Sequence, residues 1–132
     1  MIFTKIVPRV SETDGVGHIN NVFVPIWFEA GRRDIFRIFS PNLDFLDWKL
    51  ALVKVTVEYV DQLYLAENVE VRTGVEKIGT SSFTIREEIF QTNRLCAKGQ
   101  AIYVNYNFEE KKSEAIPDEI RDKLKSMNFV ET

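Results

Sequence analysis

The chain has 132 residues, of which 45% are hydrophobic, 28% charged and 12% aromatic, including ten phenylalanines. This composition is typical of one folded globular domain over residues 1–132, and it argues against a disordered or fibrous protein. The net charge of −3, with no repeated lysine and arginine stripe, argues against a nucleic-acid partner.

Too few cysteine and histidine residues are present for disulfides or zinc clusters. The single Cys96 cannot form an internal disulfide, and one histidine with one cysteine cannot supply the usual zinc ligands, so we expect no metal site. The N-terminus has neither a basic region nor a long apolar run, and no segment approaches the roughly 18 apolar residues of a membrane span. We therefore expect a cytoplasmic protein without membrane contacts.

The first predicted elements are a strand, a loop rich in turn-forming residues and a long helix. Alternating side chains predict a strand over residues 2–9. Residues 11–21 are rich in Ser, Asp, Gly and Asn, which favour turns and helix entry. Apolar residues at helical spacing then predict a helix over residues 22–39 with a broad buried face. This helix must begin close to Pro25, because proline is tolerated in the first turn of a helix.

Charged residues of this helix, Glu29, Arg32 and Arg33, fall largely opposite its apolar face. Their spacing of three or four residues makes an ion pair within the helix the default interpretation. We keep Glu29 as a secondary catalytic candidate.

A series of strands follows a predicted loop over residues 43–48. Apolar and polar residues alternate in four runs, and the connections between these runs are too short for crossover helices, which predicts an antiparallel sheet. In the last run the apolar face changes, and a bulge near Gly99 would reconcile the two halves. The four runs are residues 53–60, 69–76, 83–89 and 95–108.

A short C-terminal helix is predicted to start at Pro117, with Ile120, Leu124 and Met127 forming a narrow apolar stripe. The fold class is thus α+β, with a long helix wrapped by a five-stranded antiparallel sheet. Residues 53–60 are apolar and free of proline, so as an exposed edge they would invite pairing with another chain. We expect a homodimer, or a dimer of dimers.

Reactive and turn-forming residues concentrate in the loop before the long helix. Gly15 and Gly17 allow left-handed backbone geometry, which lets a substrate approach the main chain. Asp14 lies seven residues before a helix start near Asn21. Helix N-termini present unpaired N–H donors and a positive partial charge, which suit a carbonyl oxygen that becomes an oxyanion. An acid and an oxyanion site are therefore expected side by side.

The segment ETDGVGHINNVFVPIWFEAGR, residues 12–32, resembles the motif of the 4-hydroxybenzoyl-CoA thioesterase-like family of hotdog-fold acyl-CoA thioesterases. A weaker likeness, EKIGTSSF at residues 76–83, is similar to that family's strand-turn-strand segment. The resemblance covers most of residues 3–108. It implies a hotdog fold and hydrolysis of an acyl-CoA, or acyl-carrier-protein, thioester to free acid and thiol, with no cofactor.

Carried over by position, the resemblance gives Asp14 the role of catalytic carboxylate and the backbone N–H of Asn21 that of carbonyl polariser. Some relatives have a histidine at the position of Asn21, whereas the histidine of this chain is His18, so a catalytic role for His18 stays open beside one in ordering the loop. The turn of Gly79, Thr80, Ser81 and Ser82 is a candidate contact for pantetheine or phosphate, although serines there are more often plain turn residues.

One carboxylate and one site that polarises the carbonyl suffice for this reaction, because a thiolate with a conjugate-acid pKa of roughly 8 to 9 departs without a strong general acid. Asp14 can act as a general base on water, which we favour, or attack the thioester directly to give an anhydride. The alternative to both is a plain turn or capping residue.

Two other functions stay open. One is a hydratase or dehydratase on the same fold, for which His18 would have to supply the histidine that pairs with an acid. The other is a non-catalytic module that binds acyl thioesters, because a fold does not guarantee a function.

Overall fold

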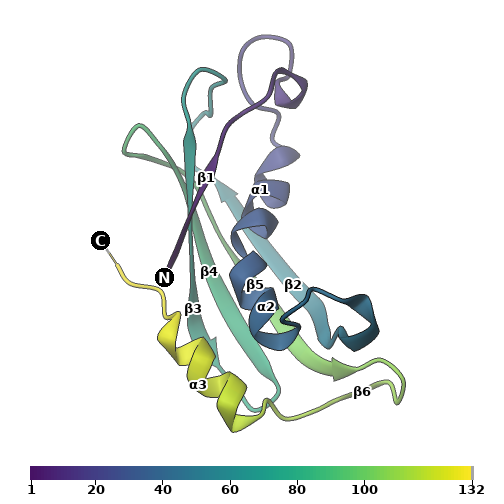
Figure 1. Cartoon of the computed structure of the whole chain (residues 1–132). Coiled ribbons are helices and arrows are strands. Elements are labelled where there is room, and N and C mark those ends of the chain that lie inside the picture. Colours follow the sequence, from purple (N-terminus) through teal and green to yellow (C-terminus); the bar gives the residue numbers. More distant parts are fainter. Residues whose placement is uncertain (132) are drawn as a thin grey trace.

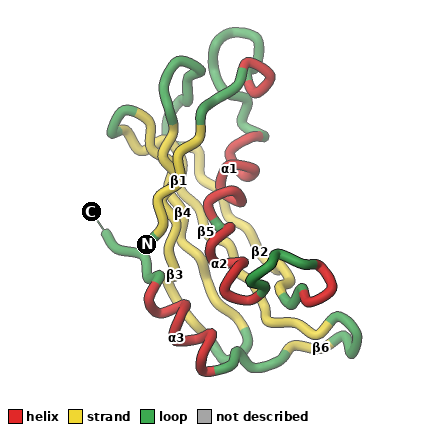
Figure 2. The backbone as a smooth tube through the Cα atoms, in the orientation of Figure 1, coloured by secondary structure: helices red, strands yellow, loops and turns green. Residues whose placement is uncertain are grey.

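The computed structural model describes residues 1–131 and has a long helix lying against a curled antiparallel sheet (Figures 1 and 2). This arrangement confirms the predicted α+β hotdog architecture. All neighbouring strands are antiparallel, and β6 pairs only with the end of β5. The strands in spatial order are β1 (Ile2–Ile6), β3 (Val69–Ile78), β4 (Ser82–Gln91), β5 (Arg94–Asn107) and β2 (Leu50–Tyr59), with β6 (Lys112–Ser113) beside them.

The predicted long helix is divided at Arg32 into α1 (Phe23–Gly31) and α2 (Arg33–Phe39). Pro25 lies in the first turn of α1, as predicted. The backbone tightens at the division, where Arg32 N–H donates to the carbonyl of Glu29, three residues earlier. Gly31 permits a very close approach to the sheet, because a Cβ at this position would lie 2.6 Å from Oγ1 of Thr73.

The prediction that Arg32 faces solvent is wrong, since its side chain is buried. The guanidinium of Arg32 forms a bidentate ion pair with Glu87 of β4, in which Nε donates to Oε1 and Nη2 donates to Oε2 at 3.0 Å. Its Nη1 donates to Tyr103 Oη at 3.1 Å. Burial raises the pKa of Glu87 despite its ion pair with Arg32. Arg32 is thus unavailable to Glu29, because a buried guanidinium needs a buried partner. Within residues 1–131, Glu29 forms no ion pair with Arg32 or with Arg33, so the default interpretation is wrong.

The predicted bulge near Gly99 is also wrong. Gly99 pairs in register with Val57 on one side and Glu87 on the other. The irregularity lies earlier, where Ile89 pairs with Ala97 and the next residue pairs with Leu95, so that Cys96 is the extra residue. Gly99 serves close packing instead, because a Cβ there would lie 2.4 Å from the carbonyl oxygen of Thr56 and 3.3 Å from the ring of Phe28.

Two further segments refine the predictions. Residues 43–48 contain a 3₁₀ turn, Phe45–Asp47, whose first N–H groups are capped by Asp44. The C-terminal helix α3 (Asp118–Ser126) follows Pro117 as predicted. The helix packs against α2 and β3, with Leu124 fully buried and Ile120 and Met127 partly buried.

The two edges of the sheet differ in protection. On one side, β1 covers the first half of β3, and Val75 of the second half exchanges backbone hydrogen bonds with Met127 and Phe129 of the C-terminal segment. On the other side, β2 pairs only with β5 within residues 1–131, and Val53, Val55 and Tyr59 are exposed. In the described part of the chain, the outer edge of β2 thus has no neighbouring strand.

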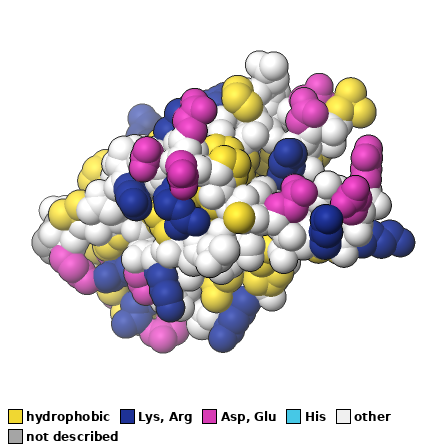
Figure 3. All heavy atoms as spheres, turned by 90° about the horizontal axis from the view of Figure 1, so that it is seen from below, with side chains coloured by type: hydrophobic (Ala, Val, Ile, Leu, Met, Phe, Trp, Pro, Cys, Tyr) yellow, Lys and Arg dark blue, Asp and Glu magenta, His cyan; other side chains and the backbone are white. Residues whose placement is uncertain are grey.

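No helix within residues 1–131 is long and apolar enough to cross a membrane. Figure 3 views the end of the molecule that carries α3, and there acidic and basic side chains are interspersed without a patch of one sign.

Candidate active site

The loop of Asp14 forms a small hairpin that is tied to the start of α1. Thr13 and Ile19 form an antiparallel bridge, and Asp14 N–H donates to the carbonyl of His18 at 2.9 Å. Gly15 and Gly17 have φ of +91° and +93°, as the sequence predicted, so any other L residue would be strained at either position. The glycines therefore allow the chain to reverse within five residues.

Asp14 itself is exposed and takes part in the turn, since its Oδ1 accepts from the N–H of Val16 at 3.0 Å. Its Oδ2 makes no hydrogen bond within the described residues. At the base of the hairpin, on the side of α1, Asn20 N–H donates to the carbonyl of Glu12. Asp14 is two residues from Glu12, and two residues of chain span at most about 7 Å. The hairpin therefore holds Asp14 close to the start of α1.

The start of α1 leaves one backbone donor unused. Asn20 accepts from Val22 N–H through Oδ1 at 3.1 Å and from Phe23 N–H through its carbonyl at 3.0 Å. The carbonyl of Asn21 accepts from Val24 N–H. Among these amides, only Asn21 N–H lacks an acceptor in the described part of the chain. An unpaired amide at the start of a helix can donate to an oxygen of a ligand.

The edge strand β2 reaches this helix start. Tyr59 Oη donates to the carbonyl of Asn21 at 3.2 Å. Tyr59 is half exposed, and so are Val22 and Ile26 on the neighbouring face of α1. The unused amide thus lies beside the open edge of the sheet, a relation that strand and helix patterns do not reveal.

The side chain of His18 contacts Tyr64, and among the described residues it forms no ion pair with Asp14. The two rings meet edge to face with centroids 5.2 Å apart, and the main chains of the two residues form an antiparallel bridge. These contacts fasten the hairpin to the connection between β2 and β3. Within the described residues the imidazole makes no hydrogen bond, so its contacts are those of a residue that orders the loop.

Glu12 is a buried carboxylate to which the sequence analysis gave no role. It accepts from Trp27 Nε1 at 3.0 Å, from Arg9 N–H at 2.7 Å and from Arg9 Nη2 at 3.2 Å. Burial alone would raise the pKa of Glu12, but the hydrogen bonds from Trp27 and Arg9 together lower it. An indole N–H on the apolar face of a helix needs an acceptor. Trp27 was therefore the residue in the sequence from which a buried acceptor such as Glu12 could have been predicted.

The remaining predicted residues lie elsewhere in the chain. Glu29 is exposed two turns along the helix, at about 12 Å from Asn21 by the rise of 1.5 Å per residue. The turn between β3 and β4 lies at the opposite end of the sheet from Asp14 (Figure 1). Its Gly79 N–H donates to the carbonyl of Ser82, and the carbonyls of Thr80 and Ser81 accept from Ile116 and Asn105. One chain therefore does not bring this turn to Asp14.

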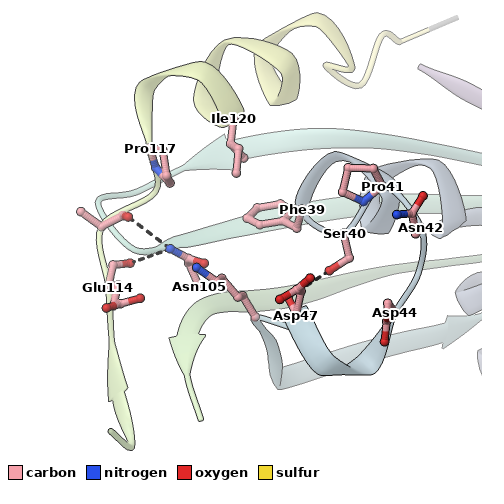
Figure 4. A pocket seen from close by; sticks show the side chains of 12 residues that line it. Phe39, Ser40, Pro41, Asn42, Asp44, Asp47, Asn105, Glu114, Pro117 and Ile120 are labelled. Atoms are coloured by element: carbon pink, nitrogen blue, oxygen red, sulfur yellow. Dashed lines mark hydrogen bonds between the residues drawn. The ribbon is translucent and has the colours of Figure 1, made fainter. Parts of the chain in front are cut away.

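A cavity of about 560 Å³ opens near that opposite end, between the end of α2 and the segment before α3 (Figure 4). Asn105 Nδ2 donates to the carbonyls of Glu114 and Ala115, and Ser40 Oγ donates to the carbonyl of Asp47. These hydrogen bonds tie the walls of the cavity together. Neither Asp14 nor Asn21 lines it.

Residues 8–124 match the sequence model of a family described as the thioesterase-like superfamily. A predicted thioesterase of known structure from Bacillus stearothermophilus is 51% identical, with a TM-score of 0.95 over 99% of this chain and 98% of that one. The uncharacterized protein YsmA of Bacillus subtilis (strain 168) is 26% identical over 125 residues, which are 92% of this chain and 84% of that protein.

A more distant structure shares the fold. It is a thioesterase from Thermus thermophilus in complex with coenzyme A and Zn, 21% identical, with a TM-score of 0.84 over 96% of this chain and 92% of that one.

Proposed function

We propose that this chain, which belongs to the thioesterase-like superfamily, hydrolyses an acyl-CoA thioester to a carboxylic acid and free coenzyme A. The observation that carries the proposal is the unused N–H of Asn21 at the start of α1, one short hairpin away from the carboxylate of Asp14. Coenzyme A is the preferred thiol because a structural neighbour was solved with coenzyme A.

In the proposed reaction, Asn21 N–H donates to the thioester carbonyl oxygen, and the positive end of α1 stabilises the charge that develops there. Asp14 takes a proton from water while the water oxygen bonds to the carbonyl carbon. The carbon–sulfur bond then breaks, and the thiolate leaves without a strong general acid because its conjugate-acid pKa is roughly 8 to 9. Neither a metal nor a cofactor takes part in these steps.

The contacts of His18 favour hydrolysis over hydration of a double bond. A hydratase would need the imidazole paired with an acid, whereas the ring of His18 packs against Tyr64. A general base is also favoured over a carboxylate nucleophile, because one oxygen of Asp14 is held by Val16 N–H in the turn.

We further propose that two copies pair through β2 as a homodimer. This strand is long and proline-free, its outer edge is unpaired within the described chain, and its exposed apolar residues adjoin the start of α1. Antiparallel pairing would bring the turn of Gly79, Thr80, Ser81 and Ser82 of one copy to the same end of the dimer as Asp14 of the other. That turn would then be available to the coenzyme A moiety.

The test is release of free thiol from a panel of short, long, branched and aromatic acyl-CoAs. Asp14→Asn should lower kcat/KM by about a hundredfold or more, because the amide cannot accept the proton from water. The matched control is Asp122→Asn on exposed α3, which should leave the rate unchanged. Circular dichroism should be the same for all three proteins. A rate for Asp14→Asn within about threefold of the unsubstituted enzyme would overturn the assignment.

A further inference from the structure

Glu12 and Trp27 join the Asp14 hairpin to α1 in the interior of the protein. Their side chains are buried, and Trp27 Nε1 donates to Glu12 Oε2 at 3.0 Å. Trp27 lies in the second turn of α1, whereas Glu12 lies at the base of the hairpin. Within residues 1–131, this is the only hydrogen bond between residues 12–19 and α1. The contact therefore fixes how the hairpin lies relative to the helix.

The main chain of Glu12 is bonded to the residue that precedes Asn21. Asn20 N–H donates to the carbonyl of Glu12 at 2.9 Å, and the unused N–H of Asn21 belongs to the next residue. In the other direction along the chain, only Thr13 separates Glu12 from Asp14. Glu12 is thus connected to the neighbours of both groups that the proposed reaction requires.

The tip of the hairpin has no buried side chain to hold it. Residues 14–17 are all exposed, and Val16 is exposed to 76%. Apart from the contact of His18 with Tyr64, the position of the tip depends on the hydrogen bonds at the base of the hairpin. A change at the base should therefore move Asp14, because no buried contact at the tip opposes the movement.

The carboxylate of Glu12 suits this task better than a neutral side chain of its size. Its two oxygens accept from three donors, which are Trp27 Nε1, Arg9 N–H and Arg9 Nη2. A glutamine has one acceptor oxygen, and its NH2 group would face an N–H donor instead of accepting from it. Glu12→Gln therefore breaks part of this arrangement with little change in side-chain volume.

We propose that Glu12 is a positioning residue, which holds the carboxylate of Asp14 at the correct distance from the N–H of Asn21 through its hydrogen bond with Trp27. This inference rests on the proposed hydrolysis. A general base must lie within hydrogen-bond reach of the water that it deprotonates, and a misplacement of about 1 Å costs on the order of a hundredfold in rate. Glu12 thus acts on the reaction through Asp14, without a contact to the substrate.

Glu12→Gln should lower kcat for thiol release about tenfold or more and change KM by less than about threefold, because it displaces the base and not the substrate. Trp27→Phe removes the indole donor, keeps the carboxylate and should lower kcat in the same direction. This second variant tests the proposal even if Glu12→Gln does not fold. Both variants are assayed with the acyl-CoA that the unsubstituted protein hydrolyses fastest.

A core variant far from the hairpin controls for a loss of stability alone. Leu124 is fully buried in α3, at the other end of the molecule from the Asp14 hairpin (Figure 1). Leu124→Ala should destabilise the fold at least as much as Glu12→Gln, since a large-to-small change in a core leaves a cavity. Its kcat should stay within about threefold of the unsubstituted value, at a temperature where circular dichroism shows each variant folded.

A double variant separates positioning from a general structural effect. If Glu12 acts only through Asp14, Glu12→Gln should lower the residual rate of Asp14→Asn by less than about twofold, because residues that act as a unit are not additive. A loss of about tenfold in the Asp14→Asn background would show that the effect does not pass through Asp14, which overturns the proposal.

The two proposals fail in different ways. Full activity of Asp14→Asn would overturn the proposed hydrolysis, and with it the role of Glu12. An unchanged kcat in either Glu12→Gln or Trp27→Phe, with Asp14→Asn impaired, would overturn only the positioning role.

Discussion

Glu12 and Asp14 are two acids two residues apart whose surroundings differ. Glu12 is buried and accepts hydrogen bonds from Trp27 and Arg9, whereas Asp14 is exposed with one oxygen in a turn. The protein's own donors occupy the oxygens of Glu12, which is the pattern of a structural carboxylate, whereas Asp14 keeps one oxygen without a donor in the described residues, as the proposed general base requires.

Glu12→Gln should destabilise the protein by about 1 to 3 kcal/mol at neutral pH, because Trp27 and Arg9 lose a charged acceptor. The lowered pKa of Glu12 also makes its contribution dependent on pH. A carboxyl whose pKa is lower in the folded state stabilises the fold above its unfolded pKa, and this contribution is lost as pH falls through the folded pKa. The unsubstituted protein should therefore lose stability below about pH 4.5 in part through Glu12.

Denaturant unfolding at pH 7 and pH 3 measures this effect. The difference in unfolding free energy between the two pH values should be smaller for Glu12→Gln than for the unsubstituted protein. Glu109→Gln, at an exposed position, serves as the control. An equal pH dependence in Glu12→Gln and the unsubstituted protein would contradict the assignment.

At the scale of elements, the helix and the sheet meet through glycines on both sides. Gly31 brings α1 against Val71 and Thr73 of β3, and Gly99 of β5 makes room for Phe28. The helix divides at Arg32, whose guanidinium contacts Glu87 across the same interface. Close approach and a buried ion pair together set how the helix lies on the sheet.

Gly31→Ala should destabilise the protein by about 1 to 3 kcal/mol, although alanine is the better helix former, because the new methyl group would overlap Thr73 and Val71. Oγ1 of Thr73 is buried and has no hydrogen-bond partner among the described residues. Thr73→Ala should therefore partly rescue Gly31→Ala, because it removes the overlap with Thr73 and the unpaired hydroxyl while the overlap with Val71 remains. Thermal unfolding of the two single variants and the double variant tests this, and a Gly31→Ala protein as stable as the original would refute it.

At the scale of the whole molecule, the unequal protection of the two sheet edges is the dominant feature. Met127 and Phe129 cover the part of β3 that β1 does not reach, whereas β2 has a neighbouring strand on one side only in the part of the chain that the structure describes. Open edges with apolar side chains are rare in isolated chains because they pair with other strands. The edge of β2 also adjoins Asn21 through Tyr59, so assembly and chemistry would share one surface.

Val55→Glu should dissociate the proposed dimer and lower thioesterase activity with it. Val55 lies near the middle of β2, so in a two-fold arrangement each new carboxylate would lie close to its own copy and repel it. Size-exclusion chromatography with light scattering gives the mass, and Val10→Glu at another exposed valine is the control. A dimer that survives Val55→Glu would contradict pairing through this edge.

Much of the fold could be predicted from the sequence, because strand alternation, helical spacing and short connections are local properties. The left-handed glycines of the Asp14 loop, the position of Pro25 and the stripe of α3 were predicted for the same reason. The segment around Asp14 was likewise visible as a cluster of turn-forming and reactive residues.

Only the tertiary structure decided which partners meet across elements. Arg32 looks solvent-exposed on a helical projection, yet it is buried because Glu87, 55 residues later, lies beneath it. The sequence predicts a bulge near Gly99, whereas in the structure this glycine makes room for Phe28. Nothing in the sequence around Glu12 distinguishes it from other acidic residues, yet in the structure it accepts a hydrogen bond from Trp27. The spacing of apolar residues within one helix or strand indicates which side of that element is buried. Hydrogen bonds and close contacts are made with residues far away in the sequence, and the spacing within one element carries no information about those residues.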